Sequence, residues 1–343
     1  MKKALLIFTM LILTQFSKAA ILLVNNVTGG PGQYVQINDA LTAANAGDTI
    51  YVSGSNIIYN TFNINKSITV IGPGTYSDKQ NAFPAKVVGF TCDNNLSNIK
   101  IQGFYFQNDA SFANKQNINN IEISGNYFNN YLTFNSALNF SNVNIANNIF
   151  GVVGLDRLEF YASTGFSNIM IQNNLFFGSI RSVNAVNTVI SNNVFINIAN
   201  AFDYFGSFFF SNAIIKDNIF YNSNPIANTV GCTYQNNISY SSSSTYPLMS
   251  GSNNLDNVNP LFVNVIAGSY STAFNFHLQN GSPAIGVSSI GDDIGYYGGT
   301  FLKTETGETL NMPVIRLMDV QNQNVPQNGN VNVKVRSTKS RTN

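Results

Sequence analysis

The chain has 343 residues, of which only 10% are charged, and it carries 17 basic and 16 acidic side chains with a single histidine. This balance argues against a nucleic-acid partner, because binding to phosphates requires clustered Lys and Arg. Without its first 20 residues the chain has 14 basic and 16 acidic side chains, which argues against a strongly anionic glycan unless Ca²⁺ bridges it.

Residues 1–20 have the pattern of a secretory signal peptide. Two lysines precede an apolar run at positions 4–13, and small residues then indicate cleavage near Ala19 or Ala20. A membrane anchor is the weaker alternative, since the run is too short for a bilayer core of about 30 Å. No later stretch of the sequence is long and apolar enough to cross a membrane. We therefore expect a protein that is secreted or held in the cell envelope, in the periplasm or on the outer surface.

A short amphipathic helix is expected near the start of the remaining chain. Residues Gln36–Ala46 are apolar at Ile37 and Leu41 and end before Gly47, which suits a helix C-terminus. A strand at Thr49–Val52 follows directly. Such a helix can cover the open hydrophobic end of a solenoid.

One sequence phrase recurs between positions 99 and 240 at intervals of about one supersecondary unit. Its clearest copy is Ile121, Ile123, Asn126 and Phe128, an aliphatic pair followed by an Asn and an aromatic residue. Further copies begin at Val143, Ile169, Thr188 and Ala213, and degenerate copies begin at Ile99 and Cys232.

The spacing within this phrase predicts a parallel β-helix. Residues two apart share one face of a strand, and the three-residue step between the pairs predicts a bend that lets both strands face one interior. Asparagine, with 56 copies in the chain, can form a ladder of side-chain hydrogen bonds at this bend, with aromatic rings stacked beside it. Asn, Gly and β-branched residues are too frequent for a helical interpretation.

The cysteines and the histidine show no pattern of a metal or catalytic site. Cys92 and Cys232 are 140 residues apart, and buried thiols are the favoured interpretation over a disulfide. His277 has no suitable partners for a catalytic triad nearby in sequence, so a structural role is expected. We predict no metal site and no cofactor.

The last part of the chain differs in kind from the repeats. From residue 301 the Asn-aromatic phrase stops, and residues 312–317 and 331–335 alternate like two strands joined by a turn at Pro326–Gly329. Two strands alone are rarely stable, so this tail is expected to be a strand pair or a partial module with a disordered basic end. The expected organisation is a signal peptide at 1–20, a β-helix with an N-terminal cap at 21–300, and the tail at 301–343.

Several motifs outside the repeats resemble those of secreted right-handed parallel β-helix proteins of the pectate-lyase-like superfamily, most closely proteins of the Bacteroidetes type. These motifs are residues 36–54 (QINDALTAANAGDTIYVSG), 259–264 (NPLFVN), 276–286 (FHLQNGSPAIG) and 293–299 (DIGYYGG). The resemblance covers about residues 30–300 and implies an all-β, right-handed parallel β-helix. The sequence departs from the pattern at Gly286, where related proteins commonly have Asp.

The resemblance implies that catalysis, where members of this superfamily have it, usually takes one of two forms. Lyases use a basic residue and typically Ca²⁺, and hydrolases use paired carboxylates. Both need charges on the same side of successive coils. Only one region qualifies, the loops expected in three consecutive coils, and it offers Arg157 or Arg181 as a base. Asp156, Glu159 and Asp203 are its candidate acids or Ca²⁺ ligands, and Phe160, Tyr161, Tyr204 and Phe205 are candidates for stacking on sugar rings.

Three functions stay open. The favoured one is a glycan-binding or surface-associated β-helix without catalysis, because the same charged residues are equally consistent with solvated ion pairs worth about 0 to 1 kcal/mol each. The alternatives are a polysaccharide lyase or glycoside hydrolase acting in a lateral groove, with Ca²⁺ if a lyase, and a structural or adhesive surface protein. The expected partner is a polysaccharide or cell-surface glycan, and the expected state is a monomer.

Overall fold

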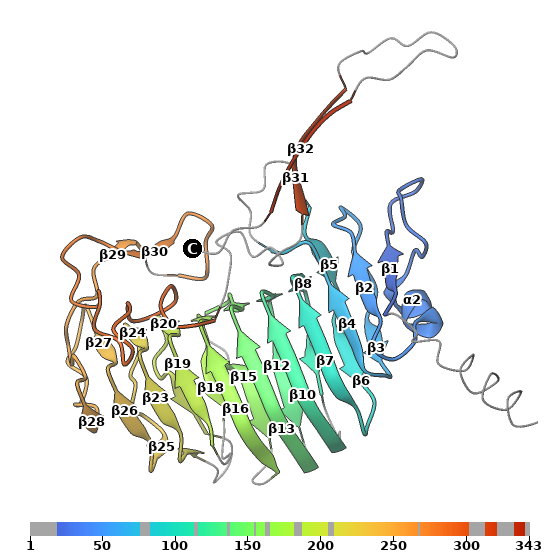
Figure 1. Cartoon of the computed structure of the whole chain (residues 1–343). Helices are drawn as coiled ribbons and strands as arrows, with labels where there is room; N and C mark the ends of the chain where they lie inside the picture. The colour runs from blue at the N-terminus through green and yellow to red at the C-terminus, as the bar shows by residue number, and fades with distance from the viewer. Residues whose placement is uncertain are drawn as a thin grey trace, which may run out of the picture.

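A computed structural model describes residues 19–75, 83–112, 116–135, 138–153, 156–161, 165–181, 187–204, 209–266, 268–301, 313–320 and 333–339. The chain winds into a parallel β-solenoid whose coils contribute one strand each to three long sheets, here called A, B and C (Figure 1). The all-β parallel solenoid expected from the repeats is therefore confirmed.

Sheet A runs the length of the solenoid and is parallel throughout. Its strands, in order, are β1 (Ile21–Val24), β2 (Thr49–Val52), β4 (Ile68–Ile71), β7 (Ser97–Gln102), β10 (Gln116–Ser124), β13 (Leu138–Ala146), β16 (Phe166–Gln172), β19 (Val189–Ser191), β23 (Ile214–Lys216), β26 (Thr233–Gln235) and β28 (Gly251–Ser252).

Sheets B and C complete the coils. Sheet B comprises β5 (Ala85–Val87), β8 (Phe104–Phe106), β11 (Tyr127–Phe128), β14 (Ile149–Phe150), β17 (Leu175–Phe176), β20 (Val194–Ile196), β24 (Ile219–Tyr221) and β27 (Ile238–Tyr240). Sheet C comprises β3 (Phe62–Ile64), β6 (Phe90–Cys92), β9 (Ala110–Ser111), β12 (Leu132–Asn135), β15 (Asp156–Tyr161), β18 (Ser179–Arg181) and β21 (Phe202–Asp203).

Three strand pairs lie outside these sheets. β22 (Phe210–Ser211) pairs in parallel with β25 (Thr229–Val230). β29 (Phe262–Asn264) pairs antiparallel with β30 (Asn275–Leu278), and β31 (Pro313–Val320) pairs antiparallel with β32 (Val333–Lys339). The last pair corresponds to the two strands expected in the tail.

A ladder of buried asparagines marks the corner between sheets A and B. Asn174, for example, donates through Nδ2 to Asn193 Oδ1 at 2.9 Å, and its own Oδ1 accepts from Asn148 Nδ2 at 3.0 Å. The same side chain also donates to the carbonyl of Ile145 at 2.8 Å. Equivalent side-chain bonds join Asn126, Asn148, Asn174, Asn193, Asn218, Asn237 and Asn254. These bonds satisfy polar groups at a buried corner, as the core requires.

The residue before each ladder asparagine explains why the sequence so often has two Asn together. Asn147, Asn173 and Asn192 have φ values of +54°, +53° and +56°. This left-handed backbone conformation costs energy for most residues, and Asn tolerates it better than other non-glycine residues. The first Asn thus makes the bend, and the second supplies the ladder side chain.

Stacked phenylalanines fill the core beside the ladder. Neighbouring ring centroids along one column lie 4.7 to 5.2 Å apart, with interplanar angles of at most 16°. This column consists of Phe106, Phe128, Phe150, Phe176, Phe195 and Phe220. All of these rings are fully buried, so the aromatic position of the repeat is a core position.

The N-terminal end is covered by helix α2 (Ile37–Ala43), which packs on β1, β2 and β3 and buries Ile37 and Leu41. The helix is shorter than expected, because its C-cap residue Ala44 is already extended, and Gly47 lies in the following turn. Lys66 Nζ instead donates to the carbonyls of Leu41 and Ala44, each at 2.7 Å. A lysine therefore satisfies the end of this helix in place of the expected glycine.

The outer face of sheet B is covered by the chain's own C-terminal strap, defined here as residues 259–266 and 268–299. Outward side chains of sheet B pack with Phe262, Phe276 and Ile294 of the strap in a second hydrophobic cluster. Polar contacts hold the strap in place, for example Tyr296 Oη donating to Asn147 Oδ1 at 2.6 Å. Asp293 accepts from the Gly286 amide at 3.0 Å, so an aspartate does organise this turn although Gly286 replaces the one expected there.

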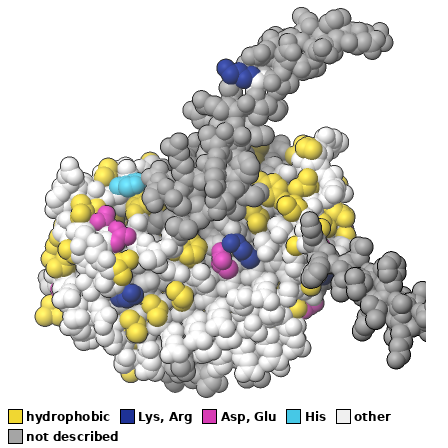
Figure 2. Space-filling model, viewed as in Figure 1, with side chains coloured by type: hydrophobic (Ala, Val, Ile, Leu, Met, Phe, Trp, Pro, Cys, Tyr) yellow, Lys and Arg dark blue, Asp and Glu magenta, His cyan; other side chains and the backbone are white. Residues whose placement is uncertain are grey.

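Cys92 is buried and Cys232 partly buried, and no disulfide joins them, so the disulfide alternative does not hold. Burial raises the pKa of the Cys232 thiol above its ordinary value. Charged side chains are few and scattered on the face that Figure 2 displays. Among the described residues, no helix combines the length and the apolar character needed to cross a bilayer.

Candidate functional site

Sheet C presents a row of polar side chains on its outer face, and three of the sequence-predicted residues, Glu159, Arg181 and Asp203, belong to it. In register across neighbouring strands, Thr133 lies beside Glu159, Glu159 beside Arg181, and Arg181 beside Asp203. Ser111 precedes Thr133 in the same row, and Asn63 and Thr91 pair in the first coils. We call these seven residues, Asn63, Thr91, Ser111, Thr133, Glu159, Arg181 and Asp203, the polar row. Glu159, Arg181 and Asp203 therefore lie side by side on consecutive coils, on strands of sheet C.

The charged end of the polar row is a cation between two carboxylates. Arg181 Nη1 lies 3.4 Å from Glu159 Oε1, and Nη2 lies 3.8 Å from Asp203 Oδ2. Thr133 Oγ1 donates to the other oxygen of Glu159 at 3.4 Å. The Glu159 side chain is only 5% exposed, whereas those of Arg181 and Asp203 are 25% and 30% exposed. Solvent reaches one side of the cluster only.

This geometry is unsuited to either expected form of catalysis. A lyase base must accept a proton, but an arginine side chain is a cation in proteins. A glycosidase needs two accessible carboxyl groups, one of which donates a proton. The Glu159 side chain is only 5% exposed and lies 3.4 Å from Arg181 Nη1, so it is not an accessible carboxyl group. The described cluster therefore orders the outer face without supplying a general acid or base.

The expected role of Phe160 is wrong. Its side chain is fully buried and stacks on Phe134 with centroids 5.0 Å apart, because alternation along β15 turns Leu158 and Phe160 inward and Glu159 outward. A sugar cannot reach this ring. The inward direction follows from the strand that β15 forms, whereas the sequence was interpreted there as a loop.

An exposed aromatic pair lies at the end of the polar row. Tyr204 and Phe209 are 47% and 45% exposed, and their ring centroids are 5.7 Å apart with an interplanar angle of 27°. The Tyr204 amide donates to Asp203 Oδ1 at 2.8 Å, which ties this ring to the charged cluster. Tyr204 was expected at the site, but Phe209 was not among the predicted site residues. The sequence does not distinguish the exposed Phe209 from its neighbour Phe210, which is buried.

The remaining predicted site residues lie outside what the structure describes. Asp156, Arg157 and Tyr161 are in β15, but their side chains are not described, and Phe205 lies between described segments. Within the described residues, no group of three or more His, Cys, Asp or Glu side chains has the arrangement of a metal site.

No protein-family model and no curated protein sequence matches this chain. Among solved structures, the pectin methylesterase from Aspergillus niger is similar, with 13% sequence identity, 76% of this chain and 94% of that chain covered, and a TM-score of 0.39. A likeness at this level carries no argument about activity. The fold rests on the strand pairing described above, and any function must be argued from the chain's own residues.

Proposed function

We propose that this chain is an exported glycan-binding β-solenoid, and that its sheet C face is the binding surface. The observation that carries the proposal is the half-exposed pair Tyr204 and Phe209 beside Arg181 and Asp203. Aromatic rings offer apolar faces to sugar rings, and neighbouring polar groups bond the hydroxyls. The polar row continues this surface across the strands of sheet C, in the direction along which a polymer can extend.

Recognition without turnover is the form of this function that the geometry favours. Arg181 lies between two carboxylates, and the Glu159 side chain is only 5% exposed, so neither of these two residues is placed as a free base or acid for turnover. Of the sequence-predicted catalytic candidates, Asp156 and Arg157 stay open as predictions. The signal-peptide pattern of residues 1–20 supports a protein that meets its glycan outside the cytoplasm.

A polysaccharide panel tests the proposal. The chain from residue 21 onward is incubated with neutral and uronate polysaccharides, with and without Ca²⁺, and binding, reducing ends and unsaturated products are recorded together. We expect binding of at least one neutral polysaccharide and no turnover. Product that disappears in Arg181→Ala or Asp203→Ala would instead make the protein an enzyme, and silence across the panel would favour a structural or adhesive role.

A matched pair of variants locates the surface. Tyr204→Ala removes one ring of the exposed pair and is expected to weaken polysaccharide binding by about tenfold, or about 1.4 kcal/mol. Phe83→Ala removes a comparably exposed ring, 58% accessible, from an early coil and is expected to bind as the parent does. Equal binding by parent and Tyr204→Ala would move the site away from sheet C.

A further inference from the structure

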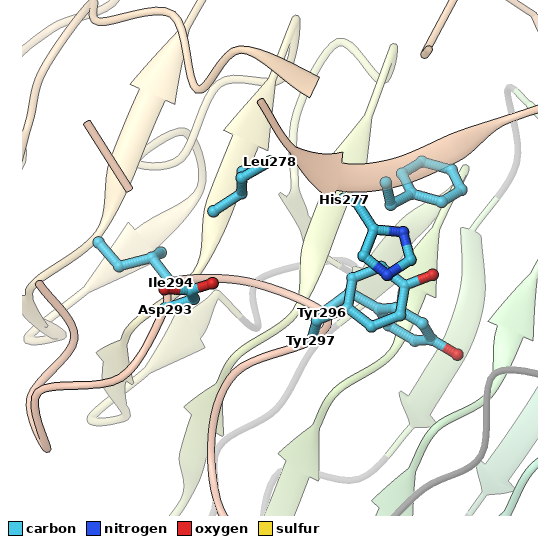
Figure 3. Close-up of a pocket in the computed structure, with 7 residues that line it drawn as sticks. His277, Leu278, Asp293, Ile294, Tyr296 and Tyr297 are labelled. Atoms are coloured by element: carbon cyan, nitrogen blue, oxygen red, sulfur yellow. The ribbon is translucent and has the colours of Figure 1, made fainter. Parts of the chain in front are cut away.

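A pocket lies within the C-terminal strap and is lined by none of the residues of the polar row (Figure 3). It contains about 360 Å³ of space, part of it open to solvent. Strand β30 and the turn that follows Asp292 line it with Phe276, His277, Leu278, Asp293, Ile294, Tyr296 and Tyr297. Small-ligand sites combine an apolar lining with a few convergent polar groups, and this pocket has that composition.

One wall of the pocket is aromatic and rigid. The rings of His277 and Tyr297 stack with centroids 3.9 Å apart and an interplanar angle of 17°. Asn275 Oδ1 lies 2.7 Å from His277 Nδ1 and also accepts from the His277 amide at 3.0 Å, so one side chain positions this residue. Tyr296, beneath them, is anchored through its hydroxyl to Asn147 of the solenoid. The wall is therefore held in place before any ligand arrives.

The opposite wall carries a carboxylate, as Figure 3 shows, with Asp293 and Ile294 across from the stacked rings. Asp293 Oδ1 accepts from the Gly286 amide, and Oδ2 makes no hydrogen bond to another described residue. Carboxylate oxygens accept hydrogen bonds from hydroxyl groups. None of the lining residues is Lys or Arg, and Figure 2 shows no gathering of basic side chains on this face. An anionic ligand would meet the carboxylate without a compensating charge.

We propose that this pocket binds a single uncharged sugar ring, such as the end residue of a glycan, between the His277–Tyr297 wall and the Asp293 carboxylate. The ring contacts the apolar side chains of Leu278 and Ile294, and one or two of its hydroxyls donate to Asp293. The pocket shares a ligand class with the polar row but has its own residues, so either site can fail without the other.

His277 is the only histidine in the sequence, so its NMR signal is unambiguous and reports on ligand binding in the pocket. The imidazole Hε1 resonance of His277 is followed by NMR while the chain from residue 21 onward is titrated with D-glucose, D-galactose, N-acetylglucosamine or D-glucuronate. D-Glucose and D-glucuronate differ only at C6, which is a hydroxymethyl group in glucose and a negatively charged carboxylate in glucuronate. We expect a saturable shift with at least one neutral sugar and binding at least tenfold weaker for glucuronate.

Two pocket variants and one control complete the test. Asp293→Asn retains an acceptor for the Gly286 amide and is expected to weaken neutral-sugar binding by about tenfold, whereas Asp292→Asn, outside the lining, leaves it unchanged. Leu278→Trp fills the pocket and abolishes the shift. The absence of a saturable shift with all three neutral sugars, or an equal shift with glucuronate, overturns the proposal. In Tyr204→Ala the shift persists, which separates this pocket from the sheet C surface.

Discussion

The outer faces of sheets B and C are built by the same coils, yet they have opposite character. Sheet B turns aliphatic side chains outward at Ile149, Leu175, Val194, Ile219 and Ile238, and the C-terminal strap buries them. Sheet C turns outward the polar row, which no described segment buries to the same extent. A solenoid coil constrains its inward residues strongly and its outward residues little, so one face can serve stability and another recognition.

Substitutions in the interior should destabilise the protein more than substitutions on either outer face. Asn174→Ala removes hydrogen bonds to two neighbouring ladder residues and leaves the Ile145 carbonyl without its amide donor. Each buried group left unsatisfied costs about 1 to 3 kcal/mol, so we expect a loss of about 4 kcal/mol or more in the free energy of unfolding. Denaturant titration measures it. A loss below that of a surface control such as Thr91→Ala would contradict the structural role of the ladder.

Substitutions on the covered outer face of sheet B should have the next largest effect on stability. Leu175 is 2% exposed between sheet B and the strap, and Leu175→Ala is expected to cost about 3 kcal/mol through lost burial and the cavity left behind. Limited proteolysis should show earlier cleavage within residues 259–299 of the variant. An unchanged cleavage pattern would mean that the strap does not depend on this apolar contact.

Substitutions on the open outer face of sheet C should destabilise the protein less. Glu159→Gln keeps the size of the side chain but removes one carboxylate from Arg181, which retains Asp203. Because Arg181 is partly solvated, we expect a loss of only about 1 kcal/mol, measured as a shift in the denaturant midpoint. A loss as large as that of Leu175→Ala would make the polar row a stability element equivalent to the covered face.

The smallest effect concerns acid sensitivity at the first coil. Hydrogen bonds from the amides of Ala20 and Asn45 hold the pKa of Asp48 below its ordinary value of 3.8. Because the folded-state pKa is the lower one, this stabilisation is complete above pH 3.8 and is lost as the pH falls through the folded-state value. Asp48→Asn should therefore be less stable than the parent at neutral pH, and thermal melts of the two should converge in acid. A difference that is constant with pH would contradict this.

The interior could be predicted from the sequence because stacking repeats one environment. Ile121, Ile123, Asn126 and Phe128 each occupy the same place as their counterparts one coil on, so spacing alone identified strands, bend and core. The separate roles of the two paired asparagines could not be predicted in the same way. Asn147, which has the positive φ, and Asn148, which forms the ladder, recur with the same spacing, so the spacing does not distinguish them.

The outer surface was predicted less well because its partners are distant in sequence. Tyr296 bonds to Asn147, and no local pattern links two residues 149 positions apart. Phe160 was misplaced for a different reason, since β15 extends a strand into a segment that was interpreted as a loop, and alternation then decides which side chains face the core. The pairing of Arg181 with two carboxylates needed the register of three strands.

Hydrogen exchange of the chain from residue 21 onward, with and without the polysaccharide that binds most tightly, tests the central claim most directly. If sheet C is the binding surface, exchange should slow in residues 179–181 and 202–211 on addition of the polysaccharide, with sheet A unchanged. Slowing confined to sheet A, or none in these two segments while the polysaccharide is bound, would contradict it.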